Sequence, residues 1–391
     1  MAALPQYDTG LLAALDEQAS AMLRVFASRG YARVEPSILQ PADVFLDRSG
    51  EEIRRRTFVF DDAEGNELCL RPDLTIPVCR IYLASGAAAE PARFCYHGPA
   101  FRFQPNEPKR PSQFLQTGVE NLGAQNRDAA DIEVLSLTVE AVRAAGLKDF
   151  SIKLGDLGLF SALVDALDIP PQWRGRLKRH FWRPGYFKEL LERLSQGAAT
   201  PAANYLAHVG QASPAEARAA LEGLMDYLGG GRATLGGRTR DEIVERLLEQ
   251  AAEAAALRLD KAQVALIENV LSVSGSAREA IAKTRTLTRG IGTSLEAPLA
   301  TMERRIVALS TLGFGDAHVS FAARFGRNME YYTGFVFELW SRDAEGVLQV
   351  AGGGRYDTLL KSLGAPNDIP SVGCAVRPER VLAARRAAEA G

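Results

Sequence analysis

Two short segments near the C-terminal end combine residue types that could hold a small polar ligand. The segment 327–338 contains Arg327 and two adjacent tyrosines, Tyr331 and Tyr332, and the segment 352–357 contains three glycines followed by an arginine and a tyrosine. An arginine offers a planar fork that matches a carboxylate, and glycines let a ligand approach the backbone closely. The pattern indicates one wall of a ligand pocket. A sheet edge with amphipathic tyrosines would use the same residues, so these two segments alone leave both interpretations open.

The spacing of apolar residues predicts strands towards both ends of the chain and a helical stretch between them. We expect helices over 11–26, 131–145 and 378–390, and strands over 31–36, 58–60, 67–71, 93–103, 113–120, 318–321, 335–338 and 371–376. Gly98 and Pro99 are expected to break the strand 93–103. Strands that stop for a helical stretch and then resume indicate an α+β fold, with an antiparallel sheet flanked by helices. We therefore expect 1–159 and 313–391 to form two parts of one domain, and 160–312 to be a mainly helical insertion.

The composition of the whole chain limits the classes of protein to consider. Its 391 residues, 47% hydrophobic and 24% charged, are ordinary for a globular protein with a sizeable core. The net charge of −2 gives no global electrostatic argument for binding nucleic acid or an anionic membrane. The four cysteines lack zinc-ligand spacing, no apolar run reaches the roughly 18 residues of a membrane span, and the common nucleotide and hydrolase motifs are absent. We expect a cytoplasmic protein with reduced thiols, without a metal site or a cofactor.

Several stretches, in the same order, resemble the signatures of histidyl-tRNA synthetases, which are class II aminoacyl-tRNA synthetases. The segments 327–334 and 352–357 resemble the two histidine-recognition signatures, 70–75 the LRP[ED]xT segment, 30–36 motif one, 101–120 motif two and 373–380 motif three. The resemblance covers about 1–150 and 314–390. It implies a class II synthetase-like antiparallel sheet and a dimer formed through the motif-one region.

The resemblance also implies roles for individual residues in binding a histidine-like ligand. Asp73, Thr75 and Gln116 would accept from the ammonium group, and Arg327 would bind the carboxylate. The same resemblance assigns Glu120, Tyr332 and Tyr356 to the imidazole, places Tyr331 in the signature beside them, and gives Arg102 the role of bridging the amino-acid carboxylate and a phosphate. No catalytic residue is expected.

The sequence departs from the synthetase pattern where ATP and tRNA would bind. Gln104 replaces a glutamate that reads adenine, Ser112 stands where a basic residue is usual, and Arg377 replaces a glycine against which the nucleotide would lie. We also expect no C-terminal anticodon-binding domain, because the chain ends about ten residues after motif three. The parts for the amino acid and the dimer are kept.

This pattern is similar to the family of synthetase paralogues that serve as regulatory subunits of ATP phosphoribosyltransferase. That resemblance implies a non-catalytic subunit that a short-form catalytic subunit requires in the first step of histidine biosynthesis. It implies a dimer within a hetero-octamer, histidine as the effector of feedback inhibition, and no nucleic-acid partner. The alternative is a stand-alone histidine-activating ligase that forms an aminoacyl-adenylate. The presence of Arg102, Arg327 and Arg380 favours this alternative. A third interpretation, a tRNA-binding module, rests only on the basic run 174–183.

Overall fold

The computed structural model describes residues 6–46, 54–86, 90–104, 111–181, 183–196, 201–227, 240–255, 259–291, 295–326 and 331–390. The chain divides into two compact units. The first contains 1–159, 273–283 and 297–391, and the second contains 160–272 and 284–296. The chain thus leaves the first unit at Phe160 and returns at Val273, before the 313 expected from the sequence pattern. Whether the units fold as separate domains stays a prediction.

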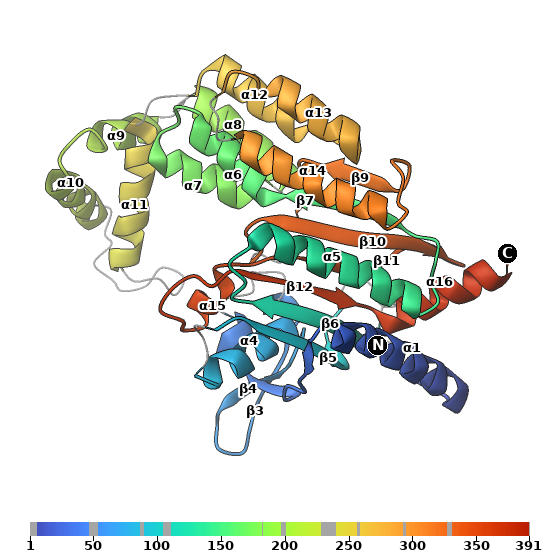
Figure 1. Ribbon diagram of the computed structural model, residues 1–391. Coiled ribbons are helices and arrows are strands. Elements are labelled where there is room, and N and C mark those ends of the chain that lie inside the picture. The colour runs from blue at the N-terminus through green and yellow to red at the C-terminus, as the bar shows by residue number, and fades with distance from the viewer. Residues whose placement is uncertain are drawn as a thin grey trace. The chain divides into compact units, whose positions relative to one another are not determined.

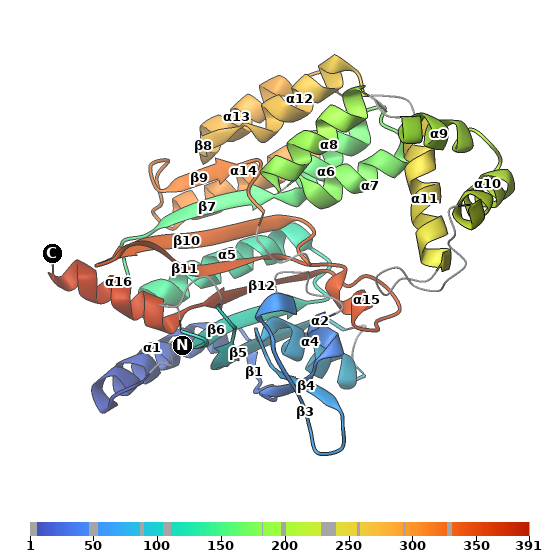
Figure 2. The same ribbon diagram turned by 180° about the vertical axis from the view of Figure 1, so that it is seen from behind.

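The first unit is built on a nine-stranded sheet (Figure 1, Figure 2). Its strands, in spatial order, are β1 (Ala32–Arg33), β5 (Ala92–Phe101), β6 (Gln113–Leu122), β12 (Ser371–Val376), β11 (Gly346–Arg355), β10 (Phe335–Asp343), β7 (Ser151–Asp156), β9 (Val319–Ala322) and β8 (Ser274–Ser276). All neighbouring pairs are antiparallel except β1 with β5 and β7 with β9. The centre of the sheet therefore joins strands from both ends of the chain, as the α+β pattern of the sequence predicts.

Three helices pack together on one face of this sheet, namely α1 (Thr9–Ser28), α5 (Arg127–Ala144) and α16 (Pro378–Ala390). Asp8 caps α1 by accepting from the backbone N–H of Leu11 at 2.7 Å, and Leu15, Met22 and Phe26 form its buried side. The unit also contains the helices α2 (Asp43–Leu46), α4 (Thr75–Ala84), α14 (Glu296–Thr311) and α15 (Leu359–Ser362), and most of α13 (Ala277–Leu287). The helical spacing in the sequence correctly predicts α1, α5 and α16.

A small antiparallel sheet precedes the large one in the chain. Its order is β2 (Leu39–Pro41), β4 (Glu67–Leu70) and β3 (Phe58–Asp61), and β3 and β4 confirm the strands expected over 58–60 and 67–71. Cys69 of β4 is fully buried in a core cluster with Phe45, Ile76 and Tyr82. The strand β4 is followed after only four residues, 71–74, by α4, so the small sheet and α4 are joined by a short connection.

The expected break in the strand 93–103 is wrong. β5 continues through Gly98 and Pro99, and Pro99 pairs with Leu115 of β6. Proline has no backbone N–H and is tolerated only where that group is not needed by a neighbouring strand. β1 pairs with β5 only at Phe94 and Cys95, so the other side of β5 is an edge where Pro99 lies. The strand β1 covers only Ala32 and Arg33 of the expected strand 31–36.

The second unit consists of helices. They are most of α6 (Leu157–Ala166) and the whole of α7 (Pro171–His180), α8 (Pro184–Gln196), α9 (Pro201–Val209), α10 (Pro214–Tyr227), α11 (Arg240–Ala255) and α12 (Lys261–Leu271). Val209, Leu221 and Ala251 form a buried cluster between α9, α10 and α11. No helix in the described part of either unit is long and apolar enough to cross a membrane.

A buried network of ion pairs ties the helices of the first unit to its strands. Asp131 of α5 accepts from Arg305 of α14 at 2.5 Å and from Arg355 of β11 at 2.6 Å. Arg305 also donates to Asp156 at 3.0 Å, and Arg355 donates to Asp357 at 2.8 Å. All five residues are less than a tenth exposed, and Asp131 is fully buried between the two arginines. Asp131 is therefore the shared carboxylate of the network.

We expect Asp131→Asn to lower the free energy of unfolding by about 3–5 kcal/mol, because it leaves two buried arginines without their shared carboxylate. Asp128→Asn is a matched control on the same helix. Asp128 pairs with Arg304, the neighbour of Arg305 on α14, but this pair is largely exposed to solvent and should contribute about 1 kcal/mol or less. Urea unfolding of both variants measures the difference, and equal losses would contradict the central role of Asp131.

Candidate functional site

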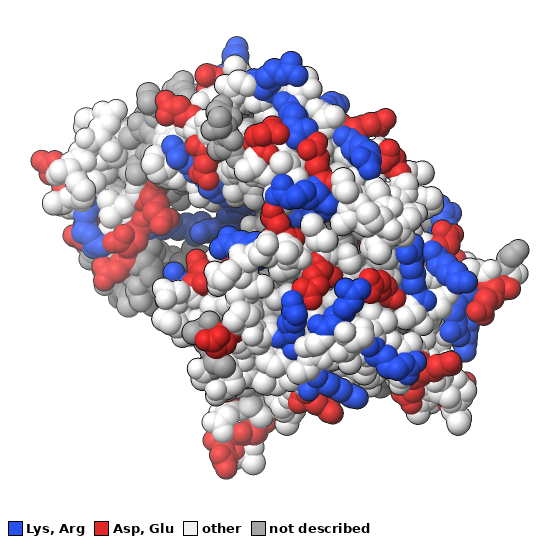
Figure 3. Space-filling model, in the orientation of Figure 1, with Lys and Arg blue, Asp and Glu red and all other residues white. Residues whose placement is uncertain are grey.

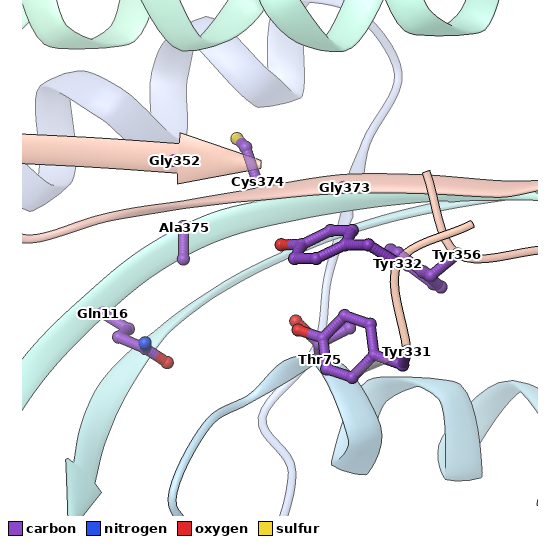
Figure 4. Close-up of a pocket in the computed structure, with 9 residues that line it drawn as sticks. All are labelled: Thr75, Gln116, Tyr331, Tyr332, Gly352, Tyr356, Gly373, Cys374 and Ala375. Atoms are coloured by element: carbon purple, nitrogen blue, oxygen red, sulfur yellow. The ribbon is translucent and has the colours of Figure 1, made fainter. Parts of the chain in front are cut away.

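A pocket lies on the face of the large sheet between the strands β6, β11 and β12, the start of α4 and the segment around Tyr331 (Figure 4). It contains about 320 Å³ of empty space, part of it open to solvent. Its lining residues are Thr75, Gln116, Tyr331, Tyr332, Gly352, Tyr356, Gly373, Cys374 and Ala375. The pocket therefore has a lining that is both polar and aromatic.

Four glycines lie on one face of the sheet at the pocket, and two of them, Gly352 and Gly373, line it. Gly373 pairs with Gly354, and Gly118 and Gly352 both pair with Ala375, which places all four on the same face of the sheet. A methyl group on Gly373 would lie 1.7 Å from Oε2 of Glu120, and one on Gly354 would lie 2.9 Å from Cδ1 of Tyr332. Side chains at these positions would displace the residues that shape the pocket. We call Gly118, Gly352, Gly354 and Gly373 the glycine floor.

The tyrosines of the pocket are held by the loops beside the buried ion network. Thr333 donates its backbone N–H to the carbonyl of Arg355 at 2.8 Å, and its hydroxyl accepts from the backbone N–H of Asp357 at 3.1 Å. The rings of Tyr331 and Tyr356 contact each other edge to face, with centroids 5.7 Å apart. These bonds join the segment that carries Tyr331 and Tyr332 to the segment that carries Tyr356, so the two sequence signatures form one wall.

Glu120 lies beneath this wall and is fully buried. Its Oε2 accepts a short hydrogen bond from the hydroxyl of Tyr356, and its Oε1 accepts from the hydroxyl of Tyr96 at 3.2 Å. Burial raises the pKa of Glu120 from 4.5 to about 8, although hydrogen bonds from Tyr356, Thr75 and Tyr96 act in the opposite direction. Because the proton of the Tyr356 hydroxyl is used for Glu120, this oxygen can act as an acceptor towards a ligand.

Two further acceptors at the site have no hydrogen-bond partner among the described residues. Oε1 of Gln116 and Oδ2 of Asp73 are both buried from solvent and unpaired. The other carboxylate oxygen of Asp73 accepts weakly from the backbone N–H of Ile76 at 3.3 Å, at the start of α4, and burial raises the pKa of Asp73. A buried acceptor without a partner costs free energy unless a ligand or water satisfies it. Of the two, Gln116 lines the pocket, so its oxygen is available to accept from an N–H donor of a ligand.

The structure brings together most, but not all, of the residues predicted from the sequence. Thr75, Gln116, Tyr331, Tyr332 and Tyr356 line the pocket, and Glu120 supports it from below. Asp73 is not among the lining residues. Arg102 donates to the carbonyl of Pro72 at 2.7 Å, just before Asp73 in the chain, and Arg327 lies outside the described residues. The expected roles of these three residues stay predictions.

The part of the sheet next to the pocket is covered by an arginine. The guanidinium carbon of Arg377 lies 3.5 Å from the ring centroid of Phe114, and that of Arg102 lies 5.4 Å from the same centroid. Gln104 and Ser112, the other two departures from the synthetase pattern, each carry a buried side-chain oxygen without a hydrogen-bond partner among the described residues. A guanidinium in contact with the face of Phe114 occupies the place where another planar group would stack.

Sequence reasoning missed Tyr96 and the contribution of β12. Tyr96 is buried, and its ring lies over Gly118, because a methyl group on Gly118 would be 2.5 Å from the tyrosine hydroxyl. The sequence could not show that Tyr96 lies opposite Gly118, because this depends on the register between β5 and β6. In Figure 4 the side chains of Ala375 and Cys374 point to opposite sides of their strand, so Ala375 borders the same side as Gln116.

The chemistry available at this site is that of binding. It offers acceptors, aromatic rings and open backbone, and the described residues contain no group of His, Cys, Asp and Glu that could hold a metal ion. All four cysteines are buried and form no disulfide. On the face of the molecule shown in Figure 3, basic and acidic side chains are interspersed.

Comparisons with known proteins agree on one family. A family model described as histidyl-tRNA synthetase matches residues 11–235 and 220–381. An ATP phosphoribosyltransferase regulatory subunit of Mesorhizobium japonicum is 37% identical over 378 residues, 95% of this chain and 98% of that protein. A protein of the same name from Allorhizobium ampelinum is 36% identical over 372 residues, 94% of this chain and 97% of that protein.

A solved structure from Bacillus halodurans C shares the fold, and its description names an ATP phosphoribosyltransferase regulatory subunit/histidyl-tRNA synthetase. The TM-score is 0.67 at 24% sequence identity, over 97% of this chain and 81% of that chain. The fold class expected from the sequence, a class II synthetase-like sheet flanked by helices, is thereby confirmed.

We expect the stability of the protein to fall with rising pH through the titration of Glu120. A carboxyl group whose pKa is raised from 4.5 in the unfolded chain to about 8 in the fold contributes its full stabilisation below about pH 4.5 and loses it as the pH rises through 8. Glu120→Gln mimics the protonated form. The difference in unfolding free energy between the variant and the wild type should therefore shift in favour of the variant by a few kcal/mol over this range.

Urea unfolding at several pH values between 4.5 and 8.5 measures this difference. Glu140→Gln is a suitable control because Glu140 forms a solvent-exposed pair with Arg29 at 3.0 Å. A Glu120→Gln difference that does not change with pH would show that the buried carboxyl keeps one protonation state throughout.

Proposed function

Since the chain belongs to the histidyl-tRNA synthetase-like family of ATP phosphoribosyltransferase regulatory subunits, we propose that it activates a short-form catalytic subunit and makes that subunit sensitive to histidine. The observation that carries this proposal is the identity of 37% over 95% of the chain to a regulatory subunit of that enzyme. The chain is a regulatory subunit in an enzyme complex and is not itself the catalyst. The reaction would be the first step of histidine biosynthesis.

The pocket on the sheet is the proposed histidine site. The ammonium group would donate to the unpaired oxygens of Gln116 and Asp73 and to Thr75, and the imidazole would lie among the three tyrosines above Glu120. Arg327 would bind the carboxylate, as the resemblance implies. Histidine inhibits the complex if it binds one arrangement of the subunits more tightly than the other, since coupling requires such a difference in affinity.

The contact between Arg377 and Phe114 supports sensing over catalysis. A histidine-activating ligase must hold ATP beside the amino acid, and here a guanidinium lies 3.5 Å from the aromatic ring next to the pocket. The ligase remains the second candidate because Arg102 and Arg380 are retained near the site. Arg380 donates to the backbone carbonyl of Gln349 at 2.9 Å. A ligase of this kind would catalyse the exchange of pyrophosphate into ATP in the presence of histidine.

The proposed partners follow from the family. The main partner is the catalytic subunit of ATP phosphoribosyltransferase, and the chain would self-associate as a dimer within a hetero-octamer in the cytoplasm. Neither a nucleic acid nor a membrane is a proposed partner.

We expect the purified protein to raise the turnover of a short-form catalytic subunit, and histidine to suppress the turnover of the mixture. Steady-state rates of the catalytic subunit alone, with the protein, and with the protein plus histidine measure both effects. No complex and no change in turnover would refute the regulatory role. Pyrophosphate exchange by the protein alone would favour the ligase.

Gln116→Leu should weaken histidine binding by about 1.5–3 kcal/mol, because it removes an acceptor for a charged donor while keeping the volume of the side chain. Isothermal titration calorimetry with histidine measures the loss. Gln18→Leu is the matched control. Gln18 is also buried with an unpaired Oε1, but it lies on α1 and donates to the carbonyl of Ala145. Unchanged affinity in Gln116→Leu would place histidine elsewhere in the complex.

A further inference from the structure

The consecutive helices α7 and α8 of the second unit (Figure 2) carry basic side chains that gather around one tyrosine. The hydroxyl of Tyr186, in the first turn of α8, accepts hydrogen bonds from Arg176 of α7 and from Arg193 of α8. The guanidinium carbon of Arg193 lies 5.7 Å from the centre of the Tyr186 ring. Two guanidinium groups from different helices therefore meet at one oxygen atom. We call Arg176, His180, Tyr186 and Arg193 the basic cluster.

His180 joins the basic cluster from the end of α7. Its ring contacts the ring of Tyr186 edge to face, with centroids 4.8 Å apart, and its Nδ1 is buried without a hydrogen-bond partner among the described residues. Burial lowers the pKa of His180. Nearby arginines lower this pKa further, namely Arg183, Arg179 and Arg176. The ring of His180 thus lies in a positive electrostatic field, and its Nδ1 can still gain a hydrogen bond.

The helix dipole accounts for only part of this arrangement. The carbonyl end of a helix stabilises basic residues in its last turn, and the last turn of α7 is basic. Lys178 of that turn also pairs with Asp165 of α6 at 2.6 Å. Neither effect explains why Arg193, which is exposed on α8, binds the hydroxyl of Tyr186 together with Arg176. Cationic groups brought together repel one another, and a bound anion would offset that repulsion.

We propose that the basic cluster binds a phosphate group of a small molecule, either a nucleotide or a phosphorylated sugar. A guanidinium carries five N–H donors in a planar fork that matches the oxygens of a phosphate. Arg176 and Arg193 can therefore each bind a phosphate oxygen while they keep their hydrogen bonds to Tyr186. The hydroxyl of Tyr186 positions the two guanidiniums, and His180 adds a further donor from its ring.

A compact phosphate ligand fits the basic cluster better than a nucleic acid does. The two guanidiniums converge on a single oxygen atom, and two acidic residues, Glu189 and Glu192, lie on the same helix α8. A nucleic-acid backbone gains its affinity from many cationic contacts spread along the strand, each of which releases counterions. The net charge of −2 on the whole chain gives no long-range attraction for such a polyanion.

Isothermal titration calorimetry with pyrophosphate, AMP and ribose 5-phosphate tests the site at about 0.15 M salt, where weak surface attractions are screened. We expect saturable binding of at least one of the three. Arg193→Gln and Arg176→Gln should each raise its Kd about 10-fold or more, because each removes a charge-assisted contact to the anion. Lys188→Gln is the matched control. It removes the same charge from an exposed position of α8, on the opposite side of the helix from Tyr186 and Arg193, and should bind as the wild type does.

Nuclear magnetic resonance keeps the test decisive if an arginine variant fails to fold. The chain has four histidines, so their ring signals can be followed individually, and His180→Gln assigns the relevant one. In the wild type, whichever of the three compounds binds should move the signal of His180, while that of His208, on α9 of the same unit, should stay in place.

Three outcomes would overturn the proposal. No saturable binding of any of the three compounds, or binding that leaves the His180 signal unmoved, would refute the site. Equal weakening in Lys188→Gln would reveal a general effect of charge. Tighter binding of a short single-stranded RNA, lost in the same arginine variants, would assign the basic cluster to a nucleic acid.

Discussion

The structure around the pocket depends on one shared carboxylate. Asp131 lies fully buried between Arg305 and Arg355, and through them it joins α5, α14, β7 and β11. Arg355 links the network to the pocket. Its carbonyl accepts from the backbone N–H of Thr333, and its guanidinium binds Asp357. Tyr332 directly precedes Thr333, Tyr331 lies one residue before Tyr332, and Tyr356 lies between Arg355 and Asp357. The three tyrosines of the pocket are thus held in place by charge pairs that do not line it.

The network and the pocket differ in how their polar groups are satisfied. In the network each carboxylate meets at least one guanidinium at 3.0 Å or less, so burial is compensated within the chain. At the pocket, Gln116 and Asp73 each keep one buried oxygen without a partner among the described residues, and Glu120 has its pKa raised by burial. In the network only Nε of Arg305 lacks a hydrogen-bond partner among the described residues, so its carboxylates are all paired, whereas the unpaired oxygens at the pocket can still gain a hydrogen bond from a ligand.

The sequence predicts much of this arrangement because local patterns and family signatures agree. The helices α1, α5 and α16, the hairpin of β3 and β4, and the meeting of 70–75, 113–120 and 352–357 at one site all follow from residues close in sequence or from ordered motifs. What the sequence does not reveal depends on register and on long-range pairing. Tyr96 over Gly118, Pro99 inside a continuous strand and Arg305 paired with Asp131 each require a partner distant in the chain. The strand β7 was missed because its six residues lie beside a long helical stretch.

The glycine floor has a consequence for how such a site can change during evolution. The glycine floor presents a flat surface whatever the family member needs to recognise, because its strands pair with one another and carry no side chains there. A methyl group at Gly373 or Gly354 would collide with Glu120 or Tyr332. New selectivity must then arise on the walls, at positions such as Thr75 and Gln116 or in the tyrosine segments. Floor and walls can diverge independently, which allows one ancestral site to be retained as architecture while the task performed on it is replaced.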